Sequence, residues 1–428
     1  MGIYFGTDGL RGVYGEVISP DIAYKVGNSL GHLCKNKKIL IGRDTRRSGD
    51  LLSLSFSSGI MSQGVDVVDV GIVPTPVVAY LVKLLKFDYG VVISASHNPK
   101  NHNGIKIFDS EGFKITEETE VEIERHILYP TEVNSERVGH YFFRPRLVKK
   151  YRDKLLSSFP DLSGLKIVLD MANGASYKLA RELFTLAGAK VIPFNYSNSG
   201  KKINHKCGAL YPEVIKEEVK LYNAHLGFAF DGDADRIIAC DKKGEILDGD
   251  DILYILSQNL KNGEEVVGTS MTNKGLEEAL NQRGIKLIRA DVGDKYVVKE
   301  MKSRSARLGG EPSGHIINSK FSTTGDGILT AMTISSLFKA SELPRFYHFP
   351  QVVVNVEVVD KFRLLNSDFL SSEVLKAQKS FEKNGRVLVR ASGTENKIRI
   401  MCEHKNQETA ILQAKKLESI IKNLEKSR

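Results

Sequence analysis

One stretch of the chain, residues 91–108, places a serine near a histidine and a lysine. Ser96 follows two small residues, which leave room for a substrate. A serine hydroxyl becomes nucleophilic when a neighbouring base or cation activates it. His97 and Lys106 are the groups in this stretch that could do so. A polar hairpin loop without chemistry is the plain alternative, and this stretch alone does not exclude it.

The residues around Ser96 predict the elements that position it. The apolar run from Gly90 to Ile93 predicts a short buried strand, and Ile105 to Phe108 predicts a second one. Asn98-Pro99 and Asn103-Gly104 each predict a turn. We therefore expect Ser96 to be exposed on a loop between two strands.

A second group of residues has the composition of a metal site. Asp231, Asp233 and Asp235 alternate with small residues directly after an apolar run. At this spacing three carboxylates can converge on one hard cation such as Mg²⁺. An EF-hand is excluded, because Arg236 and Lys242 stand where that loop needs Gly and Glu. An Asp-rich turn without a metal, or a phosphatase with an Asp nucleophile, remain alternatives.

Two further glycine-containing turns carry polar side chains. The first, residues 309–316, presents Glu311, Ser313 and His315, and its carboxylate and hydroxyl groups could bind sugar hydroxyls. The second turn is a candidate phosphate cradle, because hydroxyls, free backbone N–H groups and flanking guanidiniums bind phosphate. Its residues are Arg390, Ser392, Gly393, Thr394 and Arg399. Each of these turns could also be purely structural.

The beginning of the chain adds a weaker signal. Residues 2–12 predict a strand that runs into a glycine-rich turn, with Asp8 and Arg11 as candidates for an active-site face. The glycine spacing there is not that of a dinucleotide-binding loop.

Composition limits the class of protein. The chain has 428 residues, of which 41% are hydrophobic and 26% charged, as in ordinary globular proteins. The net charge of +9 is scattered rather than gathered in a basic stripe with aromatics, so we expect no nucleic-acid partner. No stretch resembles a signal peptide or a membrane span. The four cysteines are far apart, which favours free thiols and a cytoplasmic protein.

Alternating strands and helices predict an α/β protein of several domains. We expect three similar α/β modules with mixed sheets, at residues 1–150, 151–243 and 244–343. From about residue 344 the pattern changes, which predicts a smaller C-terminal α+β domain over residues 344–428. Its last helix, from Gln407 to about Leu424, has one apolar face.

The four motifs, in this order and one per predicted domain, resemble those of the α-D-phosphohexomutase superfamily. The opening Phe5-Gly-Thr-Asp-Gly-Leu-Arg-Gly12 and the segment Asn204-His-Lys-Cys-Gly208 are similar to its bacterial phosphoglucosamine mutase branch. The resemblance covers nearly the whole chain. It implies four domains around a central cleft, with a mobile C-terminal domain.

The resemblance also implies roles for the motif residues. Ser96 would carry a phosphoryl group, and the three aspartates would hold Mg²⁺ together with that phosphoserine. Lys106, Arg11, His97 and His315 would serve proton transfer and charge stabilisation. The remaining motif residues would bind the substrate: Glu311 and Ser313 would bind the sugar, Arg236 would also contact the substrate, and Arg390, Ser392, Gly393, Thr394 and Arg399 would surround its non-reacting phosphate.

The implied reaction interconverts glucosamine 6-phosphate and glucosamine 1-phosphate for cell-wall precursor synthesis. A glucosamine 1,6-bisphosphate would be intermediate and activator, and the enzyme could form a homodimer. Asn396, His102 and Pro312 depart from the family pattern, and these departures bear on the choice of sugar. The alternatives are phosphoglucomutase or phosphomannomutase activity, a metal-dependent sugar phosphatase, and a non-catalytic anion- or nucleic-acid-binding protein.

Overall fold

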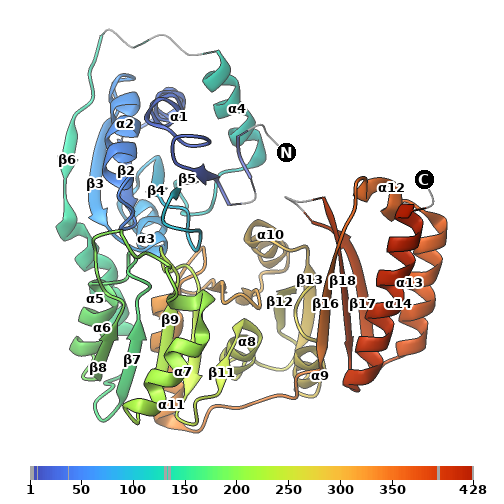
Figure 1. The fold of residues 1–428 in the computed structure, drawn as a ribbon. Coiled ribbons are helices and arrows are strands. Elements are labelled where there is room, and N and C mark those ends of the chain that lie inside the picture. Colours follow the sequence, from blue (N-terminus) through green and yellow to red (C-terminus); the bar gives the residue numbers. More distant parts are fainter. Residues whose placement is uncertain are drawn as a thin grey trace.

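A computed structural model describes residues 4–6, 8–36, 38–129, 133, 136–392 and 396–426. Four sheets follow one another along the chain, and helices cover them (Figure 1). We call each sheet with its helices a unit and number the units in chain order. The first three sheets mix parallel and antiparallel strands, as expected for α/β modules, and the fourth is antiparallel. The exact domain boundaries stay a prediction.

The first unit has a six-stranded sheet in the order β1-β5-β4-β2-β3-β6. Its first helix begins after Ser19, whose side chain accepts a hydrogen bond from the Ile22 N–H. The elements are β1 Leu10–Val13, α1 Pro20–Leu33, β2 Lys38–Arg43, α2 Gly49–Met61, β3 Asp66–Ile72, α3 Thr75–Leu85, β4 Tyr89–Ile93, β5 His102–Phe108, α4 Glu117–Leu128 and β6 Tyr141–Phe143. A short 3-10 turn, Pro145–Leu147, and α5 Val148–Ser158 lead into the second unit.

The second and third units continue the α/β pattern with sheets in the orders β11-β10-β9-β7-β8 and β13-β12-β14-β15. The second unit contains β7 Lys166–Asp170, α6 Leu179–Leu186, β8 Lys190–Phe194, a 3-10 turn at Gly208–Leu210, α7 Pro212–Leu221, β9 Leu226–Phe230, β10 Ile237–Asp241 and β11 Ile246–Leu247. The third contains α8 Gly249–Ser257, β12 Glu265–Thr269, α9 Lys274–Asn281, β13 Lys286–Ala290, α10 Asp294–Arg304, β14 Leu308–Gly310, β15 Ile316–Asn318 and α11 Gly327–Ala340.

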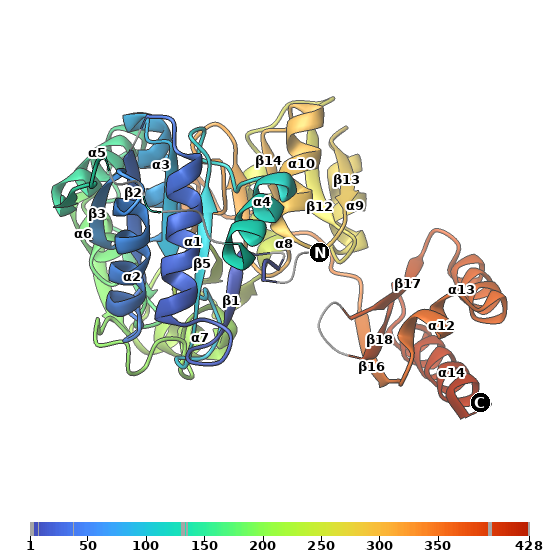
Figure 2. The same cartoon turned by 90° about the horizontal axis from the view of Figure 1, so that it is seen from above.

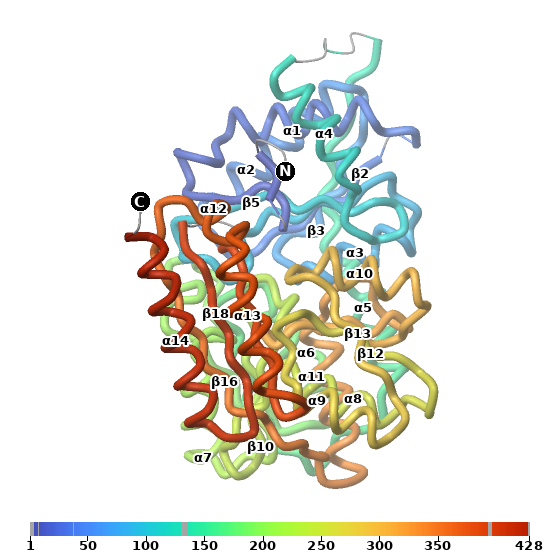
Figure 3. The backbone as a smooth tube through the Cα atoms, turned by 90° about the vertical axis from the view of Figure 1, so that its right-hand side faces the viewer, coloured from blue at the N-terminus to red at the C-terminus, as the bar shows by residue number. Residues whose placement is uncertain are grey.

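The fourth unit stands apart from the other three (Figure 2). It contains β16 Gln351–Glu357, α12 Lys361–Leu365, α13 Asp368–Phe381, β17 Gly385–Ala391, β18 Lys397–His404 and α14 Gln407–Lys426. Its helices cover the outer face of its sheet (Figure 3), and Ala414, Leu417 and Ile421 of α14 are buried there, as the apolar face predicted.

The hydrophobic cores also separate the first three units from the fourth. One core runs without interruption from Leu40 of the first unit through Phe228 of the second to Leu276 of the third. The fourth unit has its own core, which includes Ile400 and Leu417. Arg386 is a polar link to the third unit, donating to the carbonyls of Ser270 (2.5 Å) and Thr272 (2.6 Å). The first three units therefore pack as one body, to which the fourth is attached.

Two local predictions in the first unit were wrong. Asn103-Gly104 forms no turn but lies inside β5, where Gly104 pairs with Arg11 of β1. A Cβ on Gly104 would lie 2.6 Å from the Leu10 carbonyl, so only glycine allows this close approach. At the N-terminus, the described strand is Leu10–Val13, after the glycine-rich turn, and Tyr4 and Phe5 before the turn are not in a strand; residues 2, 3 and 7 of the predicted segment lie outside the described residues. Among the described helices, none is long and apolar enough to cross a membrane.

Candidate active site

Ser96 lies on the loop between β4 and β5, as predicted, but it is buried and not exposed. Its φ of +50° is in the left-handed region, which a non-glycine residue adopts only when its surroundings hold it there. The Ser96 hydroxyl donates to Asp231 Oδ2 at 2.6 Å, and His97 Nδ1 lies 3.2 Å away. The loop therefore points the candidate nucleophile at the first aspartate of the metal motif.

A buried guanidinium holds this loop in place. Arg46 donates to the Ser96 carbonyl (2.9 Å) and the Asn98 carbonyl (2.8 Å), and also to the carbonyls of Pro99 and His102. Its Nε pairs with Asp44 at 2.9 Å, with both side chains fully buried. A charge in this position needs such a set of partners, because burial without them is costly.

Residues of the second unit also contact the Ser96 loop. Asn204 donates to the same Ser96 carbonyl at 2.8 Å. A Cβ on Gly232 would lie 2.5 Å from that carbonyl, so the metal motif can approach the loop only with glycine between its aspartates. The sequence predicted neither Arg46 nor Asn204 as a functional residue, since both act through backbone atoms of distant residues.

The three aspartates follow β9 and are buried together. One carboxylate oxygen from each lies within 4.8 Å of the others. Asp233 Oδ1 and Asp235 Oδ1 are buried without a hydrogen-bond partner. Orphaned carboxylate oxygens are costly unless a cation or donor completes them. The donor set, all hard oxygens around one point, fits Mg²⁺.

Lys106 projects from β5 into the same cluster. Its ammonium lies 2.8 Å from Asp233 Oδ2, 2.9 Å from Asp235 Oδ2 and 3.3 Å from Asp8 Oδ2. Burial disfavours its charge, but these carboxylates outweigh burial and raise the pKa of Lys106 well above its usual value. Thr75 also donates to Asp233 Oδ2, at 2.6 Å.

The surroundings raise the pKa of Asp231 and lower the pKa values of Asp235 and His97. Burial and the neighbouring carboxylates of Asp235 and Asp233 raise the pKa of Asp231. Asp235 is buried too, yet Lys106 and His315 hold its pKa well below the usual range. Burial, together with Arg236 and Arg11, lowers the pKa of His97 to about 3, so this ring is neutral near pH 7.

A cavity of about 280 Å³ adjoins the cluster at the meeting point of the first three units. It brings together residues predicted separately from the sequence: Arg11, Arg236, Glu311, Ser313 and His315. Asp235 lines both the cavity and the metal cluster, whereas Ser96 and Lys106 do not line the cavity. Glu311 Oε1 accepts a hydrogen bond from the Gly293 N–H at 3.0 Å, which fixes the carboxylate at the cavity wall.

His315 connects the cavity with the aspartates. Its Nε2 accepts from the Gly325 N–H at 3.0 Å, and its Nδ1 lies 3.8 Å from Asp235 Oδ2. Burial favours the neutral ring, but the Asp235 carboxylate outweighs it and raises the pKa of His315. Double protonation would break the Gly325 bond, so the geometry here corresponds to a ring protonated on Nδ1 alone.

Two residues that the sequence analysis did not single out lie beside this cavity: Asp294, which lines it, and Lys114, which contacts two of its lining carboxylates. Lys114 bridges Asp8 of the first unit (2.5 Å) and Asp294 at the start of α10 in the third. Asp8 also pairs with Arg11 at 3.0 Å. Burial raises the pKa of Asp8, but Lys106, Lys114 and Arg11 outweigh burial and lower it well below its ordinary value.

The candidate phosphate cradle lies in the fourth unit and is not part of this cavity. Arg390 and Arg399 are opposite each other on β17 and β18 and line a separate cavity of about 200 Å³ with Met271 of the third unit. Burial, with the adjacent Arg399 charge, lowers the pKa of Arg390. Ser392 Oγ is buried without a partner. Gly393 and Thr394 lie outside the described residues.

Models of known protein families match most of the chain. Models of phosphoglucomutase/phosphomannomutase match in four consecutive parts: alpha/beta/alpha domain I at residues 2–133, domain II at 148–244, domain III at 248–348 and the C-terminal domain at 353–418. The chain belongs to the phosphoglucomutase/phosphomannomutase family. The predicted superfamily and fold class are thereby confirmed.

Curated members of this family share much of the sequence. Phosphoglucosamine mutase of Pelotomaculum thermopropionicum is 43% identical, over 95% of this chain and 96% of the relative. The Bacillus subtilis phosphoglucosamine mutase is 42% identical, over 95% and 96%.

Solved structures of the family share the fold at lower sequence identity. A phosphoglucomutase/phosphomannomutase family protein from Burkholderia thailandensis superposes with a TM-score of 0.83 at 24% identity, covering 98% of this chain and 97% of that one. Aspergillus fumigatus N-acetylphosphoglucosamine mutase, solved with GlcNAc-6P and magnesium, has a TM-score of 0.68 at 18% identity, covering 99% and 96%.

Proposed function

We propose that this family member is a phosphoglucosamine mutase, which interconverts glucosamine 6-phosphate and glucosamine 1-phosphate. The observation that carries the proposal is the Ser96 hydroxyl held 2.6 Å from Asp231 inside a buried carboxylate cluster. The choice of sugar is supported by relatives named phosphoglucosamine mutase that are 43% identical over most of the chain. The product would serve the synthesis of UDP-N-acetylglucosamine and, through it, of the cell wall.

The reaction consists of two phosphoryl transfers. In the first, the P–O bond of phospho-Ser96 breaks and a new P–O bond forms to the free sugar hydroxyl, whose proton passes to the Ser96 oxygen, to give glucosamine 1,6-bisphosphate and the free serine. The intermediate then reorients, and its other phosphoryl group returns to Ser96. The same bisphosphate, supplied from outside, would recharge an enzyme that has lost its phosphate.

We assign a Mg²⁺ ion to Asp231, Asp233 and Asp235, with a phosphate oxygen on Ser96 as a further ligand. Such an ion supplies positive charge to the oxygens of the transferring group. Lys106 adds a second positive charge at the same carboxylates. We assign His97, His315 and Arg11 to proton transfer and charge stabilisation. The low pKa of His97 makes it a hydrogen-bonding group rather than a strong base.

Substrate binding is divided between two places. Glu311 and Ser313, with Arg236, would bind the sugar in the 280 Å³ cavity. Arg390, Ser392 and Arg399 would bind the non-reacting phosphate, and we include Gly393 and Thr394 from the sequence pattern. Since these two places lie on different units, we propose that the fourth unit approaches the others when substrate binds.

Activity measurements on a panel of sugars test the proposal. Values of kcat/KM for glucosamine, glucose and mannose 6-phosphates should favour glucosamine. If glucose or mannose wins by tenfold, about 1.4 kcal/mol, the alternative phosphoglucomutase or phosphomannomutase assignment is correct. Steady release of inorganic phosphate would instead indicate a sugar phosphatase. Binding that never leads to turnover would indicate an anion-binding protein.

Assembly and location belong to the same proposal. The four cysteines carry no disulfide, which is consistent with a reducing cytoplasm. A homodimer remains a prediction, which light scattering of the purified protein would test.

A further inference from the structure

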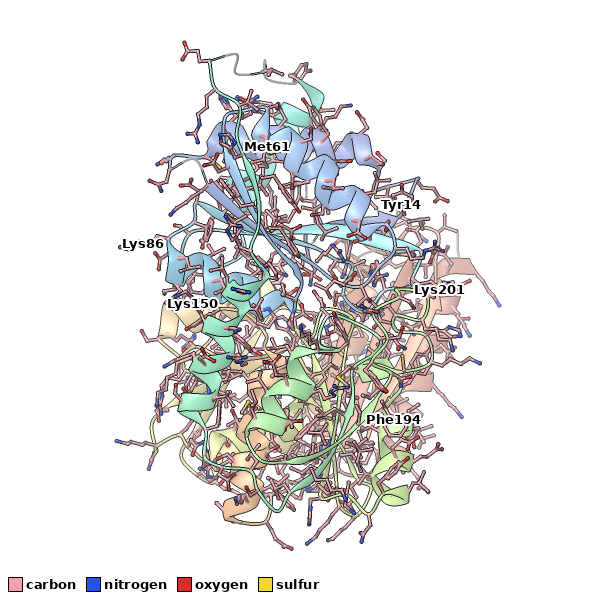
Figure 4. The ribbon with its side chains drawn as sticks, turned by 90° about the vertical axis from the view of Figure 1, so that its left-hand side faces the viewer. Tyr14, Met61, Lys86, Lys150, Phe194 and Lys201 are labelled. Carbon is pink, nitrogen blue, oxygen red and sulfur yellow. The ribbon has the colours of Figure 1, made fainter. Side chains whose placement is uncertain are left out.

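A groove of about 660 Å³ lies between the first and second units, apart from the cavity beside the aspartates. Its floor is the end of β3 and the residues after it, including Val70 and Val73, and its walls are the segment from Phe143 to Arg152 and the start of α6. Figure 4 views the molecule from this side, with Lys150 of α5 labelled. None of its lining residues has a role in the proposed reaction.

The lining of this groove is strongly basic. Arg43, Arg146, Lys149, Arg152 and Lys178 line it, against the single carboxylate of Glu182. Arg43 pairs with Asp50, and Arg152 with Glu182 at 2.6 Å. Within the described part of the chain, the other three cations have no ion pair or hydrogen bond from their side chains. An anion in the groove would therefore meet cations that are not already neutralised.

The same groove has apolar and aromatic surface between its charges. Val73 and Leu179 are buried at its base, while the Phe143 side chain is 56% exposed beside them. Tyr177 adds a second ring. Aromatic faces with nearby cations suit a flat ring that carries phosphates. Small inorganic anions would leave this apolar surface in contact with water.

The groove is also large, and contacts between its lining residues are present. The Arg152–Glu182 pair ties α5 to α6 across it, and the Val73 N–H donates to the Arg43 carbonyl at 3.0 Å. Its volume lies in the range of ligand pockets and is more than twice that of the sugar cavity. A second cavity of about 610 Å³ shares Tyr177, Lys178 and Glu182 with it and adds Arg181.

We infer that this groove is a binding site for a nucleotide, with its phosphates on Arg146, Lys149 and Lys178 and its base against the aromatic and apolar surface. This inference does not depend on which sugar phosphate the enzyme converts. Increasing salt concentration should weaken the binding, because the cations are at the surface and ions screen them.

The test is calorimetric titration of the full-length protein with ADP, without divalent metal. Pyrophosphate and adenosine, which each carry half of the recognised chemistry, serve as comparison ligands. The test variant is Arg146→Glu with Lys149→Glu. The matched control is Lys150→Glu with Lys154→Glu, which changes the charge equally on exposed residues of α5 that do not line the groove.

We expect one ADP per chain, bound at least about tenfold more tightly than pyrophosphate or adenosine. The groove variant should weaken ADP binding at least about tenfold, and the control should bind like the wild type. Both should turn over sugar phosphate normally, which shows that they are folded. No saturable ADP binding, equal loss in both variants, equal binding of pyrophosphate, or complete displacement of ADP by glucosamine 6-phosphate would each overturn the inference.

Discussion

Lys106 Nζ lies 2.8 Å from Asp233 Oδ2, inside the group of carboxylates that fits a magnesium ion. The two residues come from different units, so the pair also joins the serine-bearing sheet to the metal motif. Asp233 and Asp235 each keep one buried carboxylate oxygen, Oδ1, without a hydrogen-bond partner. A positive charge is thus built into the site before any ion arrives.

Replacing Lys106 with Met should lower kcat about a hundredfold or more, while KM changes little. A fixed charge that acts on the developing transition state contributes to the chemical step rather than to ground-state binding. Lys100→Met, an exposed lysine in the same loop, is the control and should behave as wild type. An effect confined to KM would make Lys106 a substrate-binding residue only.

Asp233→Asn should weaken Mg²⁺ binding measured by titration and reduce turnover by several orders of magnitude. A metal clamp would contribute several kcal/mol to transition-state stabilisation, and asparagine removes one of the negative charges that would hold the ion. Asp291→Asn, an exposed site, should leave both unchanged. Full activity of the wild-type enzyme after exhaustive chelation would refute the metal assignment.

Ser96 should carry a phosphate in part of the purified protein. Intact mass and peptide mapping would detect it, and Ser96→Ala should abolish both the phosphate and turnover because no carrier remains. Ser110→Ala, at an exposed position after β5, is the control. Turnover by the alanine variant, or a phosphate mapped elsewhere in active enzyme, contradicts the role of Ser96.

Arg46→Lys should destabilise the protein and disable it although the charge is kept. One ammonium cannot replace a guanidinium that serves four loop carbonyls and Asp44, so we expect a loss of about 3 kcal/mol in unfolding free energy. Urea unfolding and kcat measure the two effects. The neighbouring exposed Arg47→Lys provides the baseline, and equal behaviour of the two variants would show that Arg46 does not hold the loop.

Asp326 should make stability depend on pH between about 4 and 6. Burial raises its pKa from 3.8 to about 6, despite hydrogen bonds from the Leu329 N–H and the Tyr151 hydroxyl. Between these pH values the Asp326 carboxyl is ionised in the unfolded chain but protonated in the folded protein. The free energy of unfolding therefore falls as pH rises, by about 3 kcal/mol in all.

Asp326→Asn tests this, because asparagine still caps α11 and cannot ionise. Between pH 4 and pH 7, the free energy of unfolding should decrease by about 3 kcal/mol less in the variant than in the wild type. An identical pH profile for variant and wild type would show that Asp326 titrates normally.

Local sequence was sufficient where the functional groups are close in the chain. Asp231, Asp233 and Asp235 follow a strand at alternate positions, so their convergence could be predicted from the spacing alone. The strands on both sides of Ser96 were also predicted from local sequence, since a short apolar run bounded by turn residues is typical of a buried strand.

Tertiary pairing decided the predictions that were wrong. Asn103-Gly104 has the composition of a turn, but β1 pairs with it and uses the missing side chain for close approach. Ser96 is buried because Asn204 and Gly232 of the second unit cover its loop. Arg46 and Lys114 could not be assigned from sequence, because their partners lie far away in the chain.

The burial of Ser96 limits which donors can phosphorylate it. A protein kinase must draw an extended peptide into its own cleft, and here Arg46, Asn204 and Asp231 all hold the serine loop against the body of the protein. A small donor needs no extended peptide, only an opening at the Ser96 hydroxyl, which does not itself line the cavity beside Asp235. If the bisphosphate proposed above is that donor, the first phosphorylation of each newly made chain depends on the concentration of this sugar bisphosphate.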